Sequence, residues 1–157
     1  MAELFVNMGQ INSLKTDGIL TTVGLGSCVG VTLYDKTAKV GVMGHIFLPK
    51  SREDNAPPGK YADTGIPAMI EEARKLGAQK SRLQAKVAGG ANLFPNLNLN
   101  TVSIGEQNTM AVFENLKKYN IPIVGQDVLG NHGRKMRFFI KNGIVMVTAI
   151  GKTPKEI

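Results

Sequence analysis

The chain has one cysteine, two histidines and no tryptophan among its 157 residues. A single cysteine excludes an internal disulfide, and with two histidines it falls short of the four ligands typical of a structural zinc site. No apolar run is long enough to cross a bilayer, and the first residues, "MAELFVNMGQ", lack the basic start and apolar stretch of a secretion signal. We therefore expect a cytoplasmic protein with no disulfide, no metal, no cofactor and no membrane insertion.

The chain carries a formal charge of +7, but its basic residues are spread along the sequence instead of forming a block. Such a charge attracts polyanions of any kind, so an acidic protein and a nucleic acid are both compatible with it. Zinc-finger spacing and an aromatic RNA-binding motif are both lacking, and there are only six Phe and three Tyr. We predict no nucleic-acid partner; binding that collapses steeply with salt would indicate one.

With 43% apolar residues, the chain is long enough for one domain with a sizeable core, and we predict a single domain over residues 1–157. Short runs rich in Val, Ile, Thr and Phe, bounded by turn residues, predict strands. They lie within residues 3–8, 18–24, 28–35, 39–49, 81–90, 122–130, 134–143 and 144–151, with a hairpin turn at "KNG". The segments "KSREDNAPPGK" and "NLNLNTV" are predicted to be loops.

Two segments have helical periodicity. The first begins at Asp63 or Thr64 and stops at Gly77, and the second begins at Ser103, whose spacing to Glu106 is that of a capping box. Strands and helices do not alternate regularly. The pattern predicts a layered α+β domain with each helix covering a sheet face.

The stretch "TTVGLGSCVG" surrounds the lone cysteine, Cys28. An isolated cysteine is most often a small core hydrophobe. The glycines also suggest a phosphate-binding loop, but their spacing is one residue longer than the dinucleotide fingerprint and a strand, not a helix, is predicted to follow. A third interpretation is a tight turn that presents Cys28 to a cleft, with backbone N–H groups pointing to the same place.

A thiol nucleophile needs a base. If residues 28–34 and 40–45 form a hairpin around "DKTAK", His45 returns to the Cys28 end. Alternatively, His45 is a half-buried strand histidine satisfied by a carbonyl. His132, in "LGNHGRK", is the rival base in a glycine-flanked loop. Spacing alone leaves a Cys–His pair as a candidate and names no reaction.

Larger segments make a resemblance visible. "TVGLGSCVGV", "GVMGHIFLP", "KYADTGIPAMIEE", "AKVAGGANLF", "SIGEQN" and "GQDVLGNHGRKMRF" resemble, across nearly the whole chain, the CheD family of glutamine deamidases that act on bacterial and archaeal chemoreceptors. The resemblance implies a single-domain α/β/β/α sandwich of mixed sheets with two main helices. It places the nucleophile on Cys28, the histidine on His45 and a hydroxyl-bearing third member on Thr22. Leu129 departs from the pattern, because many relatives have glycine there.

The resemblance implies hydrolytic deamidation of glutamine side chains in the cytoplasmic domains of chemoreceptors, through a cysteine thioester. The same thiol could instead act on another amide or ester, and family members are also implicated in exchange between receptors and a CheC-type phosphatase, so a non-catalytic adaptor is the alternative. Asn108, in the second helix, is expected to cap a nearby loop. The residues proposed for the oxyanion site or substrate cleft are Gly26, Ser27, Gly89, Gly90 and Asn92.

Overall fold

The computed structural model describes residues 1–95 and 102–157, which build two five-stranded sheets and two α-helices. The outer sheet has the spatial order β1 (Glu3–Phe5), β3 (Ile19–Leu25), β8 (Arg134–Phe139), β9 (Val145–Thr148) and β10 (Lys155–Glu156). The helix-covered sheet has the order β2 (Ile11–Lys15), β5 (Val40–Ile46), β4 (Val29–Asp35), β6 (Gln84–Gly89) and β7 (Ile123–Val128). The helices are α1 (Ala62–Lys75) and α2 (Ile104–Lys118), and a short 3₁₀ turn, η1, spans Lys80–Arg82.

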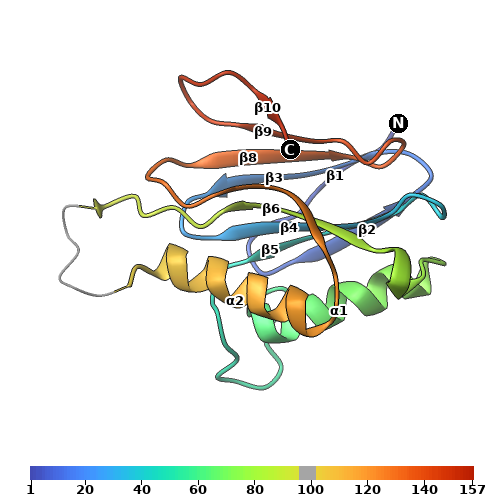
Figure 1. Cartoon of the computed structure of the whole chain (residues 1–157), viewed down its shortest axis with the longest axis horizontal. Coiled ribbons are helices and arrows are strands. Elements are labelled where there is room, and N and C mark those ends of the chain that lie inside the picture. The colour runs from blue at the N-terminus through green and yellow to red at the C-terminus, as the bar shows by residue number, and fades with distance from the viewer. Residues whose placement is uncertain (96–101) are drawn as a thin grey trace.

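Each sheet is mixed. The pairs β1–β3 and β6–β7 are parallel, and the other neighbouring pairs are antiparallel. The predicted α+β class, with mixed sheets and two main helices, is confirmed. One layer differs from the predicted α/β/β/α order, because α1 and α2 lie side by side on the same face of the helix-covered sheet (Figure 1).

The far face of the outer sheet is not covered by either helix. Along β8, Met136 and Phe138 are buried, whereas the alternating Lys135 and Arg137 point outward. Around β8 the pairing is antiparallel, and antiparallel strands can keep one face against water. Both helices bury their apolar stripes on the other sheet. Each helix covers a sheet face, as predicted, and the two share the same face.

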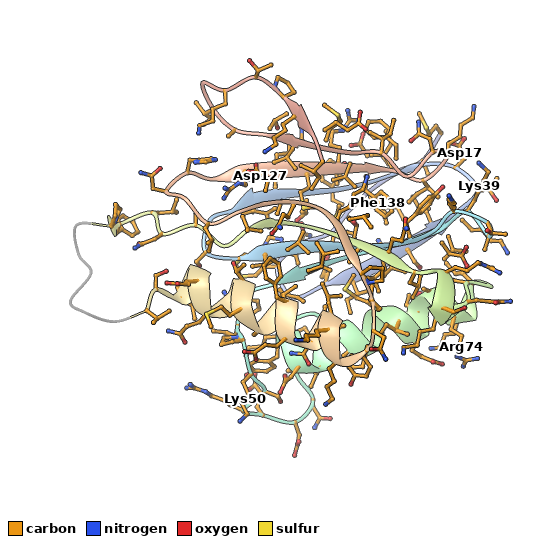
Figure 2. All side chains as sticks on the ribbon, viewed as in Figure 1. Asp17, Lys39, Lys50, Arg74, Asp127 and Phe138 are labelled. Carbon is orange, nitrogen blue, oxygen red and sulfur yellow. The ribbon has the colours of Figure 1, made fainter. Side chains whose placement is uncertain are left out.

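Two apolar layers hold the sandwich together. One lies between the helices and their sheet and includes Ile66, Met69 and Leu116; the other lies between the sheets and includes Leu20 and Phe138. Figure 2 shows Phe138 in the interior, while Lys50 and Arg74 project from the surface. The inter-sheet layer contains Cys28, which places the candidate nucleophile inside the sandwich.

The helix ends follow local signals to different degrees. Helix α2 begins as predicted, because Ser103 Oγ accepts a hydrogen bond from the Glu106 N–H at 3.2 Å. Helix α1 begins earlier than predicted, at Ala62, with Tyr61 as an N-cap that makes no side-chain cap bond. Strands β2 and β10 were not predicted, and all but Val102 of the predicted loop "NLNLNTV" lies outside the described residues.

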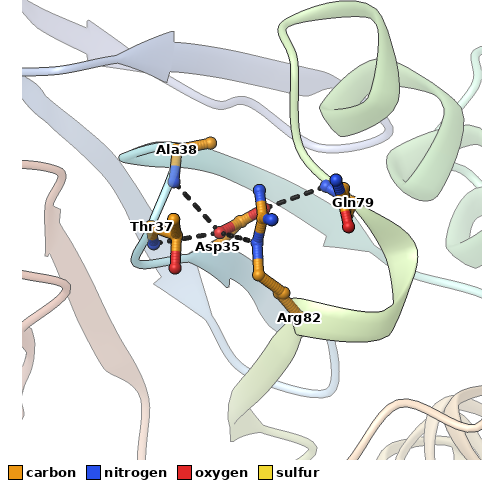
Figure 3. Close-up of polar contacts among 5 residues, drawn as sticks. All are labelled: Asp35, Thr37, Ala38, Gln79 and Arg82. Carbon is orange, nitrogen blue, oxygen red and sulfur yellow. Dashed lines mark hydrogen bonds and ion pairs between the residues drawn. The ribbon is translucent and has the colours of Figure 1, made fainter.

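The β4–β5 hairpin is anchored at its turn by the buried carboxylate of Asp35 (Figure 3). Its oxygens accept the N–H groups of Thr37, Ala38 and Gln79 at 3.0, 3.1 and 2.9 Å. The Arg82 guanidinium bonds both oxygens at 2.9 Å. Burial acts to raise the pKa of Asp35, but the hydrogen bonds from Arg82, Gln79 and Ala38 outweigh it and lower the pKa to about 2.

Asp35→Asn is expected to lower the free energy of unfolding by about 3 kcal/mol, because it removes the charge from a buried pair and turns an amide N–H₂ toward donors. The folded pKa of Asp35 lies below the unfolded value of about 3.9, so its stabilisation is present above about pH 4 and is lost as the pH falls toward 2. Urea unfolding of the wild type and the variant between pH 7 and pH 2 measures both effects. Curves for the two proteins that stay equally far apart at all pH values would contradict this account.

Candidate functional site

His45 and Thr22 come from different sheets and meet between them. Thr22 lies on β3, His45 lies on β5, and Thr22 Oγ1 is 2.7 Å from His45 Nδ1. Thr22 Oγ1 also donates to the Val6 carbonyl at 2.7 Å. Thr21 faces the other way and bonds Glu3, as strand alternation requires. The hydroxyl thus links the imidazole to the outer sheet.

These two contacts fix the tautomer of His45. A threonine hydroxyl has one proton, and donating it to Val6 leaves only lone pairs for the imidazole. Nδ1 must therefore carry the proton and donate it to Thr22, which leaves a lone pair on Nε2. Nε2 is buried and has no hydrogen-bond partner among the described residues. A buried, unprotonated and unpaired ring nitrogen is equipped to accept a proton.

The strand register brings Cys28 to this histidine. His45 is paired with Gly30 in the antiparallel β4–β5 ladder, and Cys28 lies two residues before Gly30. The face of the sheet that carries His45 is the inner one, because a Cβ at Gly30 would lie 2.3 Å from Met136 Sδ of the outer sheet. Residues two apart along a strand share a face, so continuing the β4 register by one residue puts Cys28 on the face that carries His45. Among the described residues, no hydrogen bond joins the Cys28 thiol to His45 Nε2. The predicted hairpin is confirmed.

The interpretation in which the turn presents an unburied Cys28 to a cleft is wrong, because the structure buries the thiol. Its exposed fraction is 6%, and that of His45 is 3%. Cys28 packs in the inter-sheet cluster with Leu25, Ala88 and Met136. Burial raises the pKa of the Cys28 thiol, and burial lowers the pKa of His45 against a smaller opposing effect of the Val6 carbonyl. The resting pair is therefore a neutral thiol and a neutral imidazole.

The glycine pair at the end of β6, Gly89 and Gly90, lies directly beside the cysteine turn. Gly90 N donates to the Cys28 carbonyl at 2.8 Å, and Ala91 N donates to the Gly26 carbonyl at 2.9 Å. At Gly89, φ is +110° and an added Cβ would lie 2.3 Å from the Cys28 carbonyl oxygen. Only glycine fits such a conformation and such an approach. The structure thus brings Gly26, Gly89 and Gly90 together next to Cys28.

Asn92 lies at the edge of this region. Its N–H donates to the Gly130 carbonyl at 2.9 Å. With Gly90, Leu129 and Gly130 it borders a pocket of about 210 Å³, which Ser103 and Glu106 complete. Leu129, the residue that departs from the family pattern, has φ of +69°, a left-handed conformation that favours glycine. The β3–β4 turn, the segment after β6 and the β7–β8 connection all lie at one end of the sheets (Figure 1).

Two further residues support the site. Arg134 is 4% exposed, and its guanidinium bonds Asp127 at 3.2 Å and the Gly89 carbonyl at 3.4 Å. Sequence reasoning missed Arg134, because one basic residue in "GRKMRF" carries no signal of burial. Asn108, expected to cap a nearby loop, is fully buried and donates to the Ser27 and Phe47 carbonyls at 3.0 and 3.1 Å.

The rival base, His132, borders a different pocket from Asn92. It is partly exposed in the loop before β8, where with Gly24, Lys135 and Ile150 it borders a pocket of about 500 Å³. Within residues 1–95 and 102–157, no three His, Cys, Asp or Glu side chains gather as metal ligands would. None of the helices that the structure describes has the length and apolar character to cross a membrane.

Fold and site together define a class: a two-sheet α+β protein in which a threonine hydroxyl bonds an imidazole between the sheets, with a buried thiol in the same inter-sheet layer. A family model described as "CheD chemotactic sensory transduction" matches residues 47–149. This chain belongs to the CheD family. The matched range begins after His45, so it does not itself include Thr22, Cys28 or His45.

Similar proteins extend the match over nearly the full length. The chain is 48% identical, over 98% of its length and 97% of the relative's, to the "Probable chemoreceptor glutamine deamidase CheD" of Caldanaerobacter subterraneus subsp. tengcongensis. It is 40% identical, over 93% of its length and 91% of the relative's, to the "Chemoreceptor glutamine deamidase CheD" of Thermotoga maritima. Among solved structures, the C-terminal domain of CNFy from Yersinia pseudotuberculosis aligns with a TM-score of 0.44 at 9% identity, covering 99% of this chain and 62% of that one.

Proposed function

We propose that this chain hydrolyses the side-chain carboxamide of glutamines in chemoreceptor cytoplasmic domains, giving glutamate and ammonia. Its near full-length relatives carry the name chemoreceptor glutamine deamidase. The observation that carries the proposal is the Thr22–His45 contact, because it leaves His45 Nε2 as an unpaired base on the face that Cys28 shares. Residues 1–157 would act as one catalytic domain.

In the first step, Cys28 Sγ attacks the carboxamide carbon while its proton passes to His45 Nε2. Since burial disfavours both the thiolate and the imidazolium in the resting protein, proton transfer accompanies the attack. The imidazolium then gives the proton to the amide nitrogen as the C–N bond breaks. Ammonia leaves and a thioester remains on Cys28.

In the second step, water attacks the thioester carbonyl and His45 Nε2 takes a proton from it. The C–S bond breaks, glutamate is released, and the proton returns to Cys28 Sγ. Throughout, Thr22 holds the imidazole in the Nδ1–H tautomer and bonds its charged form, the part played by the orienting third member of a triad.

We place the oxyanion site and the substrate cleft at the junction of the cysteine turn with the segment after β6. Gly26 and Ser27 shape the turn, and Gly89 and Gly90 allow the close approach of the two segments. Asn92 borders the adjoining pocket. Backbone N–H groups that converge beside the thiol would stabilise the charge that develops on the carboxamide oxygen.

The pH dependence of kcat/KM follows from the burial of His45. Its base form is lost as Nε2 is protonated, and burial lowers its pKa below the ordinary value of about 6.5. We expect kcat/KM to stay level from pH 8 down to pH 6.5 and to reach half its maximum at a lower pH. Initial rates of ammonia release between pH 4.5 and pH 8 measure the profile. A midpoint above pH 7 would contradict a resting neutral imidazole in a buried site.

The test of the function is incubation of the chain with the cytoplasmic fragment of a chemoreceptor, followed by peptide mass spectrometry. The expected result is conversion of particular glutamines to glutamate with release of one ammonia for each. Binding of the fragment without conversion would contradict the proposal and favour the adaptor role between receptors and a CheC-type phosphatase.

A further inference from the structure

Asn108 occupies an unusual position for an amide side chain. It lies in the second turn of α2 and is fully buried, and its Nδ2 donates to two backbone carbonyls that belong to different segments. Its Oδ1 is buried without a hydrogen-bond partner among the described residues. The amide orientation is fixed by chemistry, because turning it over would face an oxygen toward two carbonyl oxygens. The side chain therefore acts as a double donor.

The two carbonyls lie where the β4–β5 ladder ends. Val29 and Ile46 are its last pair, and continuing the register would place Cys28 opposite Phe47. Instead, Asn108 Nδ2 donates hydrogen bonds to the carbonyls of Ser27 and Phe47, at 3.0 and 3.1 Å. One amide thus ties the residue before the nucleophile to the strand end that follows His45.

The bond to Ser27 also sets the direction of the Cys28 N–H. No peptide bond within the described ranges 1–95 and 102–157 is cis, so the Ser27 carbonyl and the Cys28 N–H point in opposite directions. Because the carbonyl is held toward α2, the N–H points away from the helix layer. It therefore points toward the inter-sheet side, on which His45 lies. No hydrogen bond among the described residues has the Cys28 N–H as its donor. An unused N–H on the nucleophile is suited to bind an oxyanion.

We propose that Asn108 is a positioning residue, which holds the Ser27–Cys28 peptide so that the Cys28 N–H stabilises the oxyanion formed when Cys28 attacks a carbonyl. This inference rests on the proposed function of Cys28. It assigns to α2 a role in catalysis that is separate from covering the sheet. The reacting group is the Cys28 N–H, and Asn108 acts only through it.

Two small reagents separate positioning from simple stabilisation of the fold. With p-nitrophenyl acetate, Cys28 Sγ bonds the acyl carbon, His45 Nε2 takes the thiol proton and p-nitrophenolate leaves after an oxyanion has formed. With iodoacetamide, Sγ displaces iodide from a CH₂ carbon and no oxyanion forms. The ratio of the acylation rate to the alkylation rate cancels changes in the access and pKa of Cys28.

Asn108→Ala is expected to lower this ratio 10- to 100-fold, within reach of the loss seen when an oxyanion donor is removed. Asn115→Ala is the matched control, because Asn115 lies on the same helix and its side chain bonds the Ala111 carbonyl of that helix; its ratio is expected to stay within threefold of wild type. If Asn108→Ala fails to fold, Asn108→Ser, which keeps one donor, is expected to lower the ratio by about tenfold.

A ratio within threefold of wild type in the folded Asn108 variant would overturn the inference, as would a wild type whose Cys28 is alkylated but never acylated. The readout needs no receptor, so failure of the proposed function remains distinguishable. Acylation of Cys28 without deamidation of receptor fragments would overturn the substrate and leave the role of Asn108 standing.

Discussion

Cys28→Ser is expected to lower the rate of glutamine deamidation by roughly 10⁴-fold or more, the scale seen when a hydrolase loses its nucleophile. A serine hydroxyl is a far weaker nucleophile than a thiol, and the neutral His45 lacks an acidic partner that would raise its basicity, since Thr22 supplies only a hydroxyl. Ammonia release and peptide mass spectrometry with a chemoreceptor fragment measure the loss.

Cys28→Ser is expected to leave the fold nearly intact, so a loss of activity in this variant reports on the nucleophile and not on unfolding. The side chains are similar in size, so we expect the free energy of unfolding to change by about 1 kcal/mol. Receptor binding is expected to persist. A Cys28→Ser protein that deamidates within tenfold of wild type would exclude the thiol as the nucleophile and return Cys28 to the role of a core residue.

His45→Asn is expected to lower kcat by about 10³-fold, because general acid–base catalysis contributes 10² to 10⁴. The substitution is chosen for its geometry. An asparagine N–H₂ can replace the Nδ1–H donor that bonds Thr22 Oγ1, so the link between the sheets is kept while the Nε2 base is lost. Steady-state kinetics should show the loss in kcat, with KM changed much less.

The other histidine provides the matched control. His132 lies in the loop before β8, borders a separate pocket and is partly exposed. His132→Asn should retain kcat within threefold of wild type. If His132→Asn lost as much activity as His45→Asn, the assignment of the base to His45 would be wrong.

Local patterns were enough to predict the hairpin that places His45. Alternating Val and Gly residues on both sides of "DKTAK" define two strands of equal length, and the register then follows from the turn. Ser103 likewise predicts the start of α2 from its own side chain. These features depend on residues close together in the sequence.

Features that depend on distant segments could not be predicted in this way. Cys28 is buried because the outer sheet, with Met136, closes over it. The double hydrogen bond of Asn108 joins α2 to two segments far away in sequence. Both helices pack on one sheet, while the far face of the outer sheet carries Lys135 and Arg137; which face of β8 is turned outward depends on its pairing with β3.

Interception of the acyl-enzyme tests the central claim, hydrolysis through Cys28, most directly. Hydroxylamine attacks thioesters, so its addition during turnover of a chemoreceptor fragment should convert the modified glutamines partly to γ-glutamyl hydroxamates, detected by peptide mass spectrometry. The account predicts hydroxamate at the same positions that otherwise become glutamate, and none with Cys28→Ser. Glutamate formation without hydroxamate, at a rate that Cys28→Ser retains, would contradict the account.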